Sequence, residues 1–251
     1  MNGSHRIDAG LLVGGVVQPG TSWILRDSRA WWGPNDPDTR DRRGAIVDVA
    51  IWHWTGGRPF ADVDAARRVF TNVEARKRED GSDMDVSFHF LVGWSGFVWQ
   101  LCDLAIGTVH AGDGAMIRRS VGIECAWPGY ISQARKLRVE GHEVTRMLEG
   151  TRKTMLRPSD AMEEACARLA ATLSSLDPAT GARIPRQVPG DSRGVMSTRF
   201  SVKQARTWRG HAEHFHLPVS AARRRAGKLR FDSGTLRVEA LAKSGFRIVE
   251  P

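Results

Sequence analysis

The chain has 251 residues and 41% of them are hydrophobic, which suits one sizeable globular domain with a buried core. The longest apolar run near the N-terminus, residues 11–17, contains two glycines and is far shorter than a membrane span. It is also a poor signal-peptide core. We therefore expect no stable membrane insertion and no export by a standard route.

The formal charge of +9 and the pI of about 10.3 favour polyanionic partners, such as nucleic acid, anionic membranes or the bacterial envelope. The basic residues are scattered in short clusters at 40–43, 118–119 and 223–225, without a basic helix or a known nucleic-acid motif. We expect each cluster to face solvent, because runs of charge usually do. We therefore expect no nucleic-acid partner.

Three cysteines are present, Cys102, Cys125 and Cys166, and no two of them form a C-x-x-C pair. An odd number in this arrangement predicts neither a disulfide framework nor a cysteine zinc knuckle. It indicates a reducing, cytoplasmic origin. Cys125 is expected to be a small core residue, because no group that would activate a nucleophile is apparent near it in the sequence.

The predicted elements begin after residue 26, because residues 1–26 are Gly-rich and weakly patterned and read as an irregular arm. A single domain is expected over residues 27–251. Residues 45–52 (AIVDVAIW) form a largely apolar run that predicts a buried central strand. Apolar residues then recur at steps of three and four from Val63 to Val73, which predicts an amphipathic helix.

Two β-prone runs, 86–92 and 97–101, are separated by the four residues Gly93 to Gly96, and this spacing predicts a hairpin. Residues 121–126 read as another short strand. The charged segment 129–157 is ambiguous and is predicted to be helix plus loop.

A helix is expected after Pro158, with Ser159 as its N-cap. Residues 185–199 read as a turn-rich loop. The order strand, helix, hairpin, strand, helix predicts an α/β fold with a central mixed sheet flanked by helices. The apolar stripe of the helix after Ser159 is predicted to consist of Ala161, Ala165, Leu169, Leu173 and Leu176.

Histidines stand where strands are expected to end, and such positions commonly carry functional groups. His53 follows the first predicted strand, His110 follows the hairpin, and three more lie in the segment GHAEHFH at 210–216. A catalytic zinc needs about three His, Asp or Glu ligands and one open position. Since His53 and the later histidines are about 160 positions apart, only the fold could bring them together.

Six segments follow one another along the chain: SRAWWG, IWHWTGG, VSFHFLVGWSGFVWQLCD, VHAGDG, SVGIECAW and RGHAEHFH. In this order they resemble the zinc-dependent N-acetylmuramoyl-L-alanine amidases that share a fold with peptidoglycan recognition proteins and phage amidase lysozymes. The most specific match is the predicted hairpin at 86–103. The resemblance covers roughly residues 27 to 240.

The resemblance implies one Zn²⁺ in a surface groove, bound by His53, by His211 in the GH segment and by an aspartate further on. Asp232 in RFDSG fits that position best, although its distance from His211 is longer than expected and a serine stands where proline is usual. His214 and His216 remain competing ligands.

The catalytic groups also follow from the resemblance. Some relatives use a tyrosine as the base, but Phe88 occupies that position here, so Glu124 of the GIE strand is expected to carry the proton. Arg230 would stabilise the oxyanion, with Lys228 as the alternative. His110 would face the substrate; the alternative is a hydrogen-bonded structural histidine.

The substrate-binding residues are expected to include tryptophans, because aromatic faces suit sugar rings and apolar stems. At least half of the nine tryptophans are expected to lie in the core, and His89 is expected to be structural. The predicted substrate-binding residues are Trp54, Trp94, Trp127 and Arg118.

Together, these expectations predict a hydrolase that cuts the amide bond between N-acetylmuramic acid and L-alanine in peptidoglycan. A basic monomer of this kind suits a bacteriolytic, antimicrobial phage or prophage endolysin that stays in the cytoplasm until it is released to the cell wall. The alternatives are a cytoplasmic cell-wall recycling amidase and a peptidoglycan-binding module that has lost hydrolysis.

Overall fold

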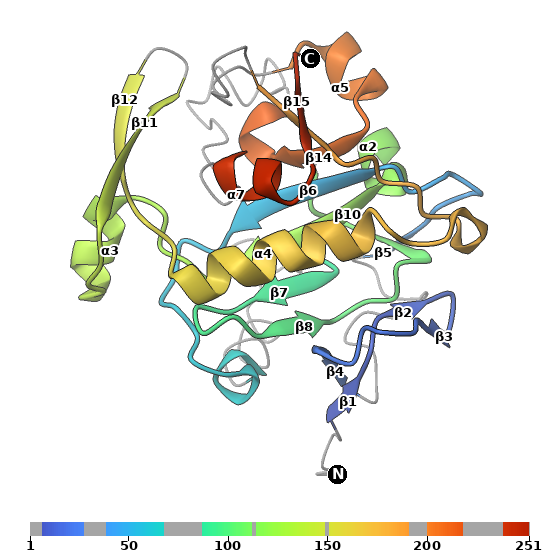
Figure 1. Cartoon of the computed structure of the whole chain (residues 1–251), viewed down its shortest axis with the longest axis horizontal. Coiled ribbons are helices and arrows are strands. Elements are labelled where there is room, and N and C mark those ends of the chain that lie inside the picture. Colours follow the sequence, from blue (N-terminus) through green and yellow to red (C-terminus); the bar gives the residue numbers. More distant parts are fainter. Residues whose placement is uncertain are drawn as a thin grey trace, which may run out of the picture.

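The computed structural model describes residues 7–27, 39–67, 87–111, 114–148, 151–190, 200–217 and 238–250. Within them, helices flank a central mixed sheet (Figure 1), so the predicted α/β fold class is confirmed. None of the described helices has the length and apolar character needed to cross a membrane.

The main sheet has seven strands within the described residues, in the order β1-β4-β8-β7-β10-β6-β14. Four neighbouring strands, β7, β10, β6 and β14, are parallel, so their carboxyl ends meet at one edge of the sheet. The strands are β1 (Ile7–Ala9), β4 (Ile24–Asp27), β8 (Val98–Gln100), β7 (Phe90–Val92), β10 (Ser120–Cys125), β6 (Val49–Trp54) and β14 (Gly210–Glu213).

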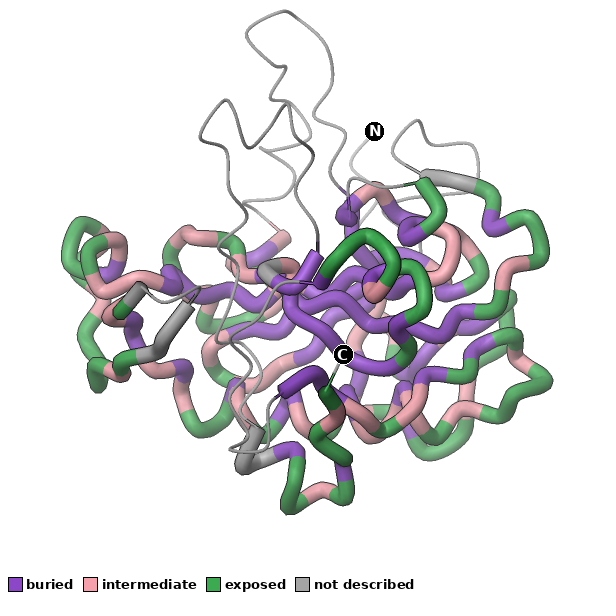
Figure 2. The backbone as a smooth tube through the Cα atoms, turned by 90° about the horizontal axis from the view of Figure 1, so that it is seen from above, coloured by how far each residue is buried: buried purple, intermediate pink, exposed green. Residues whose placement is uncertain are grey.

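Strand β6 separates two apolar layers, because successive side chains of a strand point to opposite faces. Ala50 and Trp52 pack in the largest core cluster with helix α4 (Asp160–Leu173), and we call this side the α4 face. Val49 and Ile51 pack in a second cluster on the other side, which we call the His53 face. The central strands are buried along most of their length (Figure 2), as the apolar run predicted, and only Trp54 and Glu124 near their carboxyl ends are half-buried.

The two faces are covered by different helices. Helix α7 (Val238–Lys243) contributes Leu241 to the core on the α4 face. Helices α2 (Gly114–Arg119) and α5 (Val202–Thr207) contribute to the cluster on the His53 face. Both sides of the sheet are therefore packed, which explains why its central strands contain few polar residues.

Helix α4 begins where the sequence predicts. The Ser159 side chain accepts a hydrogen bond from the Met162 amide at 3.1 Å, which satisfies one of the free donors of the first turn. Its buried stripe starts one residue later than expected, since Met162 is buried and Ala161 is exposed. The buried residues are Met162, Ala165, Cys166, Leu169, Ala170 and Leu173.

The predicted hairpin is confirmed as β7 and β8, which pair antiparallel from Phe90 opposite Gln100 to Val92 opposite Val98. The Gly93 amide donates to the Phe97 carbonyl oxygen at 2.9 Å and closes the turn. A Cβ on Gly93 would lie 2.0 Å from the Phe97 ring, so this position needs glycine. The strand predicted at 121–126 is β10.

The predicted irregular arm at residues 1–26 is wrong for its described part. Strand β1 pairs with β4, and β4 pairs with β8, so both extend the main sheet. Between them lies a small hairpin of β2 (Leu12–Val13) and β3 (Val16–Val17). Leu11 and Ile24 are fully buried in the core. Strands this short carry too few residues for an alternating pattern to stand out, so the sequence did not show them.

The segment 129–157 is partly helix, as predicted, but its second half is a β-ribbon. Helix α3 (Ile131–Leu137) is followed by β11 (Glu143–Leu148) and β12 (Thr151–Leu156), which pair with each other and project from the body (Figure 1). Met155 and Leu156 are buried at its base. The other ribbon residues whose side chains are described are exposed or half-buried. Most of them are polar, so this part of the sequence resembled a loop.

The remaining elements lie around the sheet. Residues 63–67 are helical, and the rest of the predicted helix at 63–73 lies outside the described residues. The predicted loop at 185–199 contains a strand, β13. These elements are β5 (Thr39–Asp41) paired with β9 (Ile106–Thr108), β13 (Gln187–Pro189) paired with β15 (Arg247–Val249), and the 3-10 turns η1 (Pro178–Thr180) and η2 (His214–His216).

Candidate active site

His53 and Glu124 lie side by side at the carboxyl ends of β6 and β10. They are directly paired in the parallel register of the two strands, and adjacent strands lie about 4.8 Å apart. Paired residues of neighbouring strands point to the same side, so both side chains are on the His53 face. The His53 ring is 2% exposed, whereas Glu124 is half-buried. A carboxylate therefore stands beside an imidazole at one sheet edge.

His214 joins this pair from the next strand. It begins the turn η2 immediately after β14, and β14 is the parallel neighbour of β6. The Nδ1 atoms of His53 and His214 are 3.0 Å apart, and their ring centroids are 4.3 Å apart. Three adjacent parallel strands thus deliver His53, Glu124 and His214 to one place.

The two imidazoles suit a shared metal ion. Two nitrogens bound to one tetrahedral zinc at 2.0–2.1 Å would lie roughly 3.4 Å apart, close to the 3.0 Å between the Nδ1 atoms of His53 and His214. Within the described part of the chain, no three His, Cys, Asp or Glu side chains form a group that could hold a metal. The spacing of the His53 and His214 nitrogens thus fits two ligands of one zinc ion, and a third ligand is not found among the described residues.

His110 supports His53 from below. Its ring meets the His53 ring edge-on, with centroids 5.6 Å apart. Its Nδ1–H donates to the Thr108 carbonyl oxygen at 2.7 Å, and its Nε2 lies 2.9 Å from the Ser120 hydroxyl. Burial lowers the pKa of His110 well below its usual range, and the neighbouring His53 and His89 lower it further. The ring is therefore a neutral, fixed support for His53.

Gly122 makes room for that support. A Cβ at this position in the middle of β10 would lie 2.6 Å from Cγ of His110, so any side chain would displace the ring. A glycine inside a strand often marks such a close approach. The SVGIE segment thus places both Glu124 and the space that His110 fills.

A buried network extends from His110 to Arg42. The Gly122 amide donates to Nδ1 of His89 at 3.0 Å, so Nε2 of His89 carries the hydrogen and donates to the Ile106 carbonyl oxygen at 2.8 Å. The Arg42 guanidinium lies 3.0 Å from the same Nε2. Burial, and then the Arg42 charge, lowers the pKa of His89 well below its usual range.

Arg42 is itself 5% exposed and donates to the carbonyl oxygens of Leu104 at 2.7 Å and Arg118 at 2.8 Å. Burial lowers its pKa to about 10. The expectation that the 40–43 cluster faces solvent is thus wrong for Arg42. Backbone carbonyls, which the sequence does not reveal, hold its charge in the interior.

His211 lies on the opposite side of the sheet from His53. It pairs with Ala50, on the α4 face, and is fully buried. The Trp52 indole donates to its Nδ1 at 3.2 Å, so its Nε2 carries the hydrogen and donates to the Ser174 hydroxyl at 2.9 Å. Burial lowers the pKa of His211 to about 3. Both ring nitrogens are therefore committed to the core.

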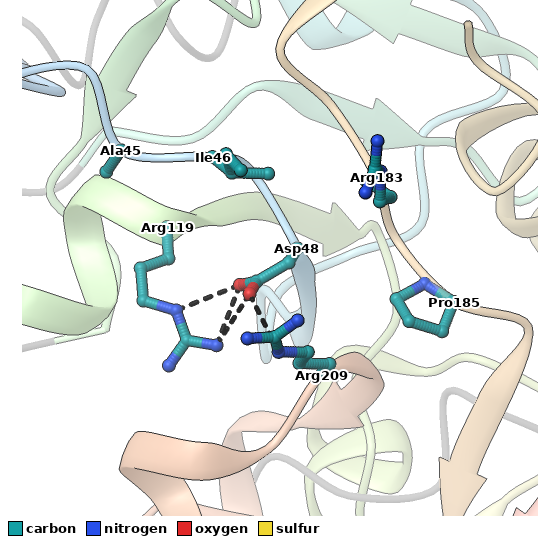
Figure 3. A pocket seen from close by; sticks show the side chains of 7 residues that line it. All are labelled: Ala45, Ile46, Asp48, Arg119, Arg183, Pro185 and Arg209. Carbon is teal, nitrogen blue, oxygen red and sulfur yellow. Dashed lines mark hydrogen bonds and ion pairs between the residues drawn. The ribbon is translucent and has the colours of Figure 1, made fainter. Parts of the chain in front are cut away.

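The opposite ends of the same strands carry a different polar group. Asp48, Arg119 and Arg209 immediately precede β6, β10 and β14. Arg119 binds both carboxylate oxygens of Asp48 at 2.9 Å, and Arg209 approaches Asp48 at 3.4 Å (Figure 3). Ile46 and Pro185 complete the wall of a hollow there. This network ties together the starts of three strands.

A family model described as N-acetylmuramoyl-L-alanine amidase matches residues 43–194, which is more than half of the chain. The chain belongs to the N-acetylmuramoyl-L-alanine amidase family. The matched range includes His53, His110 and Glu124, and it ends before His211 and His214. None of the curated proteins matches the chain.

Several solved structures are similar to this chain, although their sequence identity to it is low. The N-acetylmuramoyl-L-alanine amidase LysC from Clostridium intestinale is 10% identical, with 89% of this chain and 98% of that chain covered and a TM-score of 0.42. The amidase AmiD from E. coli is 18% identical, with 51% and 43% covered and a TM-score of 0.33. The Drosophila receptor PGRP-LCa ectodomain is 11% identical, with 62% and 71% covered and a TM-score of 0.37.

In this amidase-family chain, the histidines proposed from the sequence as the second ligand and as a competing ligand lie in different places. The structure brings His53 together with His214, which the sequence left as a competitor, and not with His211. The side chains on a strand alternate between faces, so the first residue of GHAEHFH that can reach His53 depends on the register of β14. His216 is fully buried, and its Nδ1 accepts from the Glu213 amide at 3.0 Å.

The three tryptophans predicted to bind substrate differ in how far they are buried. Trp127 is fully buried, so it cannot contact a ligand as it stands. Trp54 points to the α4 face, opposite His53, and packs edge-on against Trp127 and Tyr130 with centroid distances of 6.0 and 5.5 Å. Trp94 is half-buried in the β7–β8 turn against the main core. Large aromatics add most to stability when buried, and here that role prevails.

The other predicted residues have separate outcomes. Arg118 stands just before β10, at the end away from Glu124, so its backbone lies more than about 13 Å from the candidate site along the strand. His110 matches the alternative of a hydrogen-bonded structural histidine. The predicted ligand Asp232 and the oxyanion candidates Arg230 and Lys228 lie outside the described residues.

Proposed function

We propose that the chain hydrolyses the amide bond between N-acetylmuramic acid and L-alanine in bacterial peptidoglycan, with zinc as its cofactor. Membership of the amidase family supports the reaction class. The observation that carries the proposal is the meeting of His53, Glu124 and His214 at the carboxyl ends of three parallel strands. Ligands bind at this edge in many open α/β sheets.

His53 and His214 would bind the zinc through their Nδ1 atoms. We retain Asp232 as the proposed third ligand, because a carboxylate that completes two histidines is a common catalytic zinc shell. A zinc ion at this position would supply a water of lowered pKa and a Lewis acid for the amide carbonyl. His110 would hold the His53 ring in one orientation, as partners of metal-binding histidines commonly do.

Glu124 would move the proton in this reaction. As a half-buried carboxylate beside His53, it can accept a proton from the attacking water and deliver it to the nitrogen of L-alanine as the C–N bond breaks. The hydroxyl of the water ends on the lactyl carbonyl carbon, and the products are a carboxylate and a free amine. Arg230 remains our proposed oxyanion donor, with Lys228 as the alternative.

The biological setting that we propose is a phage or prophage endolysin that acts as a monomer on the cell wall after release from the cytoplasm. The formal charge of +9 supports this setting, because a basic protein is drawn to an anionic polymer and its envelope. A recycling amidase would instead take small soluble muropeptides.

Digestion of purified sacculi tests the reaction. Mass spectrometry of the soluble fragments should find stem peptides with free L-alanine amino termini, and chelation of zinc should stop their release. Binding to sacculi without any released peptide would instead indicate the recognition module that has lost hydrolysis. Full turnover in a zinc-free preparation would contradict the proposal that zinc is the cofactor.

A second assay tests the setting. Initial rates on intact sacculi and on soluble muropeptides at matched amide concentration should favour the sacculi, and the preference should shrink at high salt, where charge attraction is screened. Faster turnover of the soluble muropeptides would favour the recycling amidase.

A further inference from the structure

Two of the three cysteines lie side by side where helix α4 packs against strand β10. Cys125 is the last residue of β10 and Cys166 is in α4, and their Sγ atoms are 3.7 Å apart. Their exposed fractions are 1% and 4%. All three cysteines are free thiols, and Cys102 belongs to a different apolar cluster, on the His53 face.

We infer that Cys125 and Cys166 are a disulfide-forming pair, which becomes bonded when the chain folds under oxidising conditions. A disulfide bond is about 2.05 Å long, so the two sulfur atoms, now 3.7 Å apart, need to approach by about 1.6 Å. The inference does not rest on the proposed function.

The oxidant is a low-molecular-weight disulfide such as oxidised glutathione. One cysteine attacks it as a thiolate and forms a mixed disulfide, which releases one glutathione thiol. The second cysteine then attacks the bound sulfur and releases the second thiol. Two electrons pass from the cysteine pair to glutathione, and the two cysteine protons end on the two glutathione thiols.

Burial decides when this exchange can take place. The hydrogen bond with Cys166, and then burial, raises the pKa of the Cys125 thiol well above its usual range, so little thiolate is present. The attacking species is the thiolate, and a side chain that is 1% exposed offers the oxidant no access. The bond therefore forms while the chain folds, and the folded protein keeps the redox state of the place where it folded.

The disulfide would close a loop between residues 41 positions apart and would restrain the unfolded chain. For a loop of this length in a chain of this size, we expect the Tm to rise on the order of 10 °C. The bond would also fix the end of β10, next to Glu124, to helix α4.

Refolding of the reduced, denatured chain tests the inference. One sample is refolded with a mixture of oxidised and reduced glutathione and one with reduced glutathione alone, and both are alkylated and digested with trypsin without reduction. The three cysteines fall in three different tryptic peptides, so a link identifies its partners directly. The oxidised sample should contain the Cys125–Cys166 link and should melt on the order of 10 °C higher.

Two variants complete the test. Cys102→Ala should keep the link and the difference in Tm, whereas Cys166→Ala should lose both. If refolding fails in the tube, directing the His53→Ala chain, which by the proposed function leaves the host cell wall intact, to the bacterial periplasm with an appended signal offers a second route to oxidative folding. The absence of the 125–166 link by either route that yields folded protein, or a link through Cys102, would overturn the inference. Formation of the link as rapidly in the folded protein as during refolding would overturn the role of burial.

Discussion

The strands β6, β10 and β14 carry polar residues at both ends, and the two ends are built differently. At the amino ends, Asp48 is held by Arg119 and Arg209, and the charges oppose each other within the group. Arg119 also donates to the carbonyl oxygens of Arg206 at 2.5 Å and Trp208 at 2.8 Å. These contacts fix the strand starts and the helix before β14.

At the carboxyl ends, His53, Glu124 and His214 bring together groups that bind metals and carry protons at neutral pH. A row of buried neutral rings, His110 and His89, holds His53 from beneath. The same strands therefore supply stability at one edge of the sheet and, by our proposal, chemistry at the other. Substitutions at the carboxyl ends should therefore change zinc content and turnover, whereas those at the amino ends should change the free energy of unfolding.

The largest effect is expected from the histidines at the carboxyl ends. His53→Ala and His214→Ala should each reduce peptide release from sacculi to background and should lower the zinc content of the purified protein, because each removes one ligand. His211→Gln is the matched control from the other face of the same sheet, and it should retain zinc. Zinc loss in His211→Gln, with His214→Ala unaffected, would restore His211 as the ligand.

Glu124→Gln should lower turnover by on the order of 10²–10⁴-fold, the usual contribution of a general acid–base group. The amide keeps the size of the side chain but cannot accept the proton. Turnover per bound zinc and the Tm are measured together. If Glu124 served only the fold, the variant would lose stability and keep its turnover.

Arg119→Met should affect the amino ends and leave the chemistry intact. Asp48 would keep only the longer contact with Arg209, and its carboxylate side chain is 10% exposed. Removing one partner of a fully buried pair costs about 3–5 kcal/mol, and we expect about 2–3 kcal/mol here because Arg119 is partly exposed. Urea unfolding measures the loss. A drop in turnover per folded molecule would contradict the division between the two ends.

The smallest effect concerns the pH dependence that His211 adds to stability. Its pKa is about 3 in the folded chain and about 6.5 when unfolded, so only the unfolded chain takes up the proton between these values. The contribution to stability is complete above pH 6.5 and is lost as the pH falls toward 3, by about 1.4 kcal/mol per pH unit. Unfolding free energies at pH 6, 5 and 4 should therefore fall more steeply in the wild type than in His211→Gln.

The difference between the two proteins isolates His211, because His89 and His110 are also buried with lowered pKa values and contribute equally to both. Equal slopes would show that His211 is not a neutral core residue. Glutamine is suitable as the replacement because its amide can both accept from Trp52 and donate to Ser174.

The features that depend on neighbouring residues could be predicted from the sequence. The apolar run of β6, the glycines of the β7–β8 hairpin and the Ser159 cap each fix local structure within a few residues, and all three are found as predicted. Local patterns also predicted that His53 directly follows one strand and that Glu124 lies within another. The two residues are directly opposite each other only because β6 and β10 are parallel neighbours in the sheet.

Other features depend on which face of the sheet a side chain lies on and on which elements pack against that face, so they appear only in the folded chain. His211 and His214 are three positions apart, but one lies in the core on the α4 face and the other beside His53, because β14 pairs with β6 in one register. The contact between Cys125 and Cys166, and the carbonyl cage around Arg42, join residues distant in sequence. A single sequence records such contacts in no local pattern, since they form only when helices and strands pack.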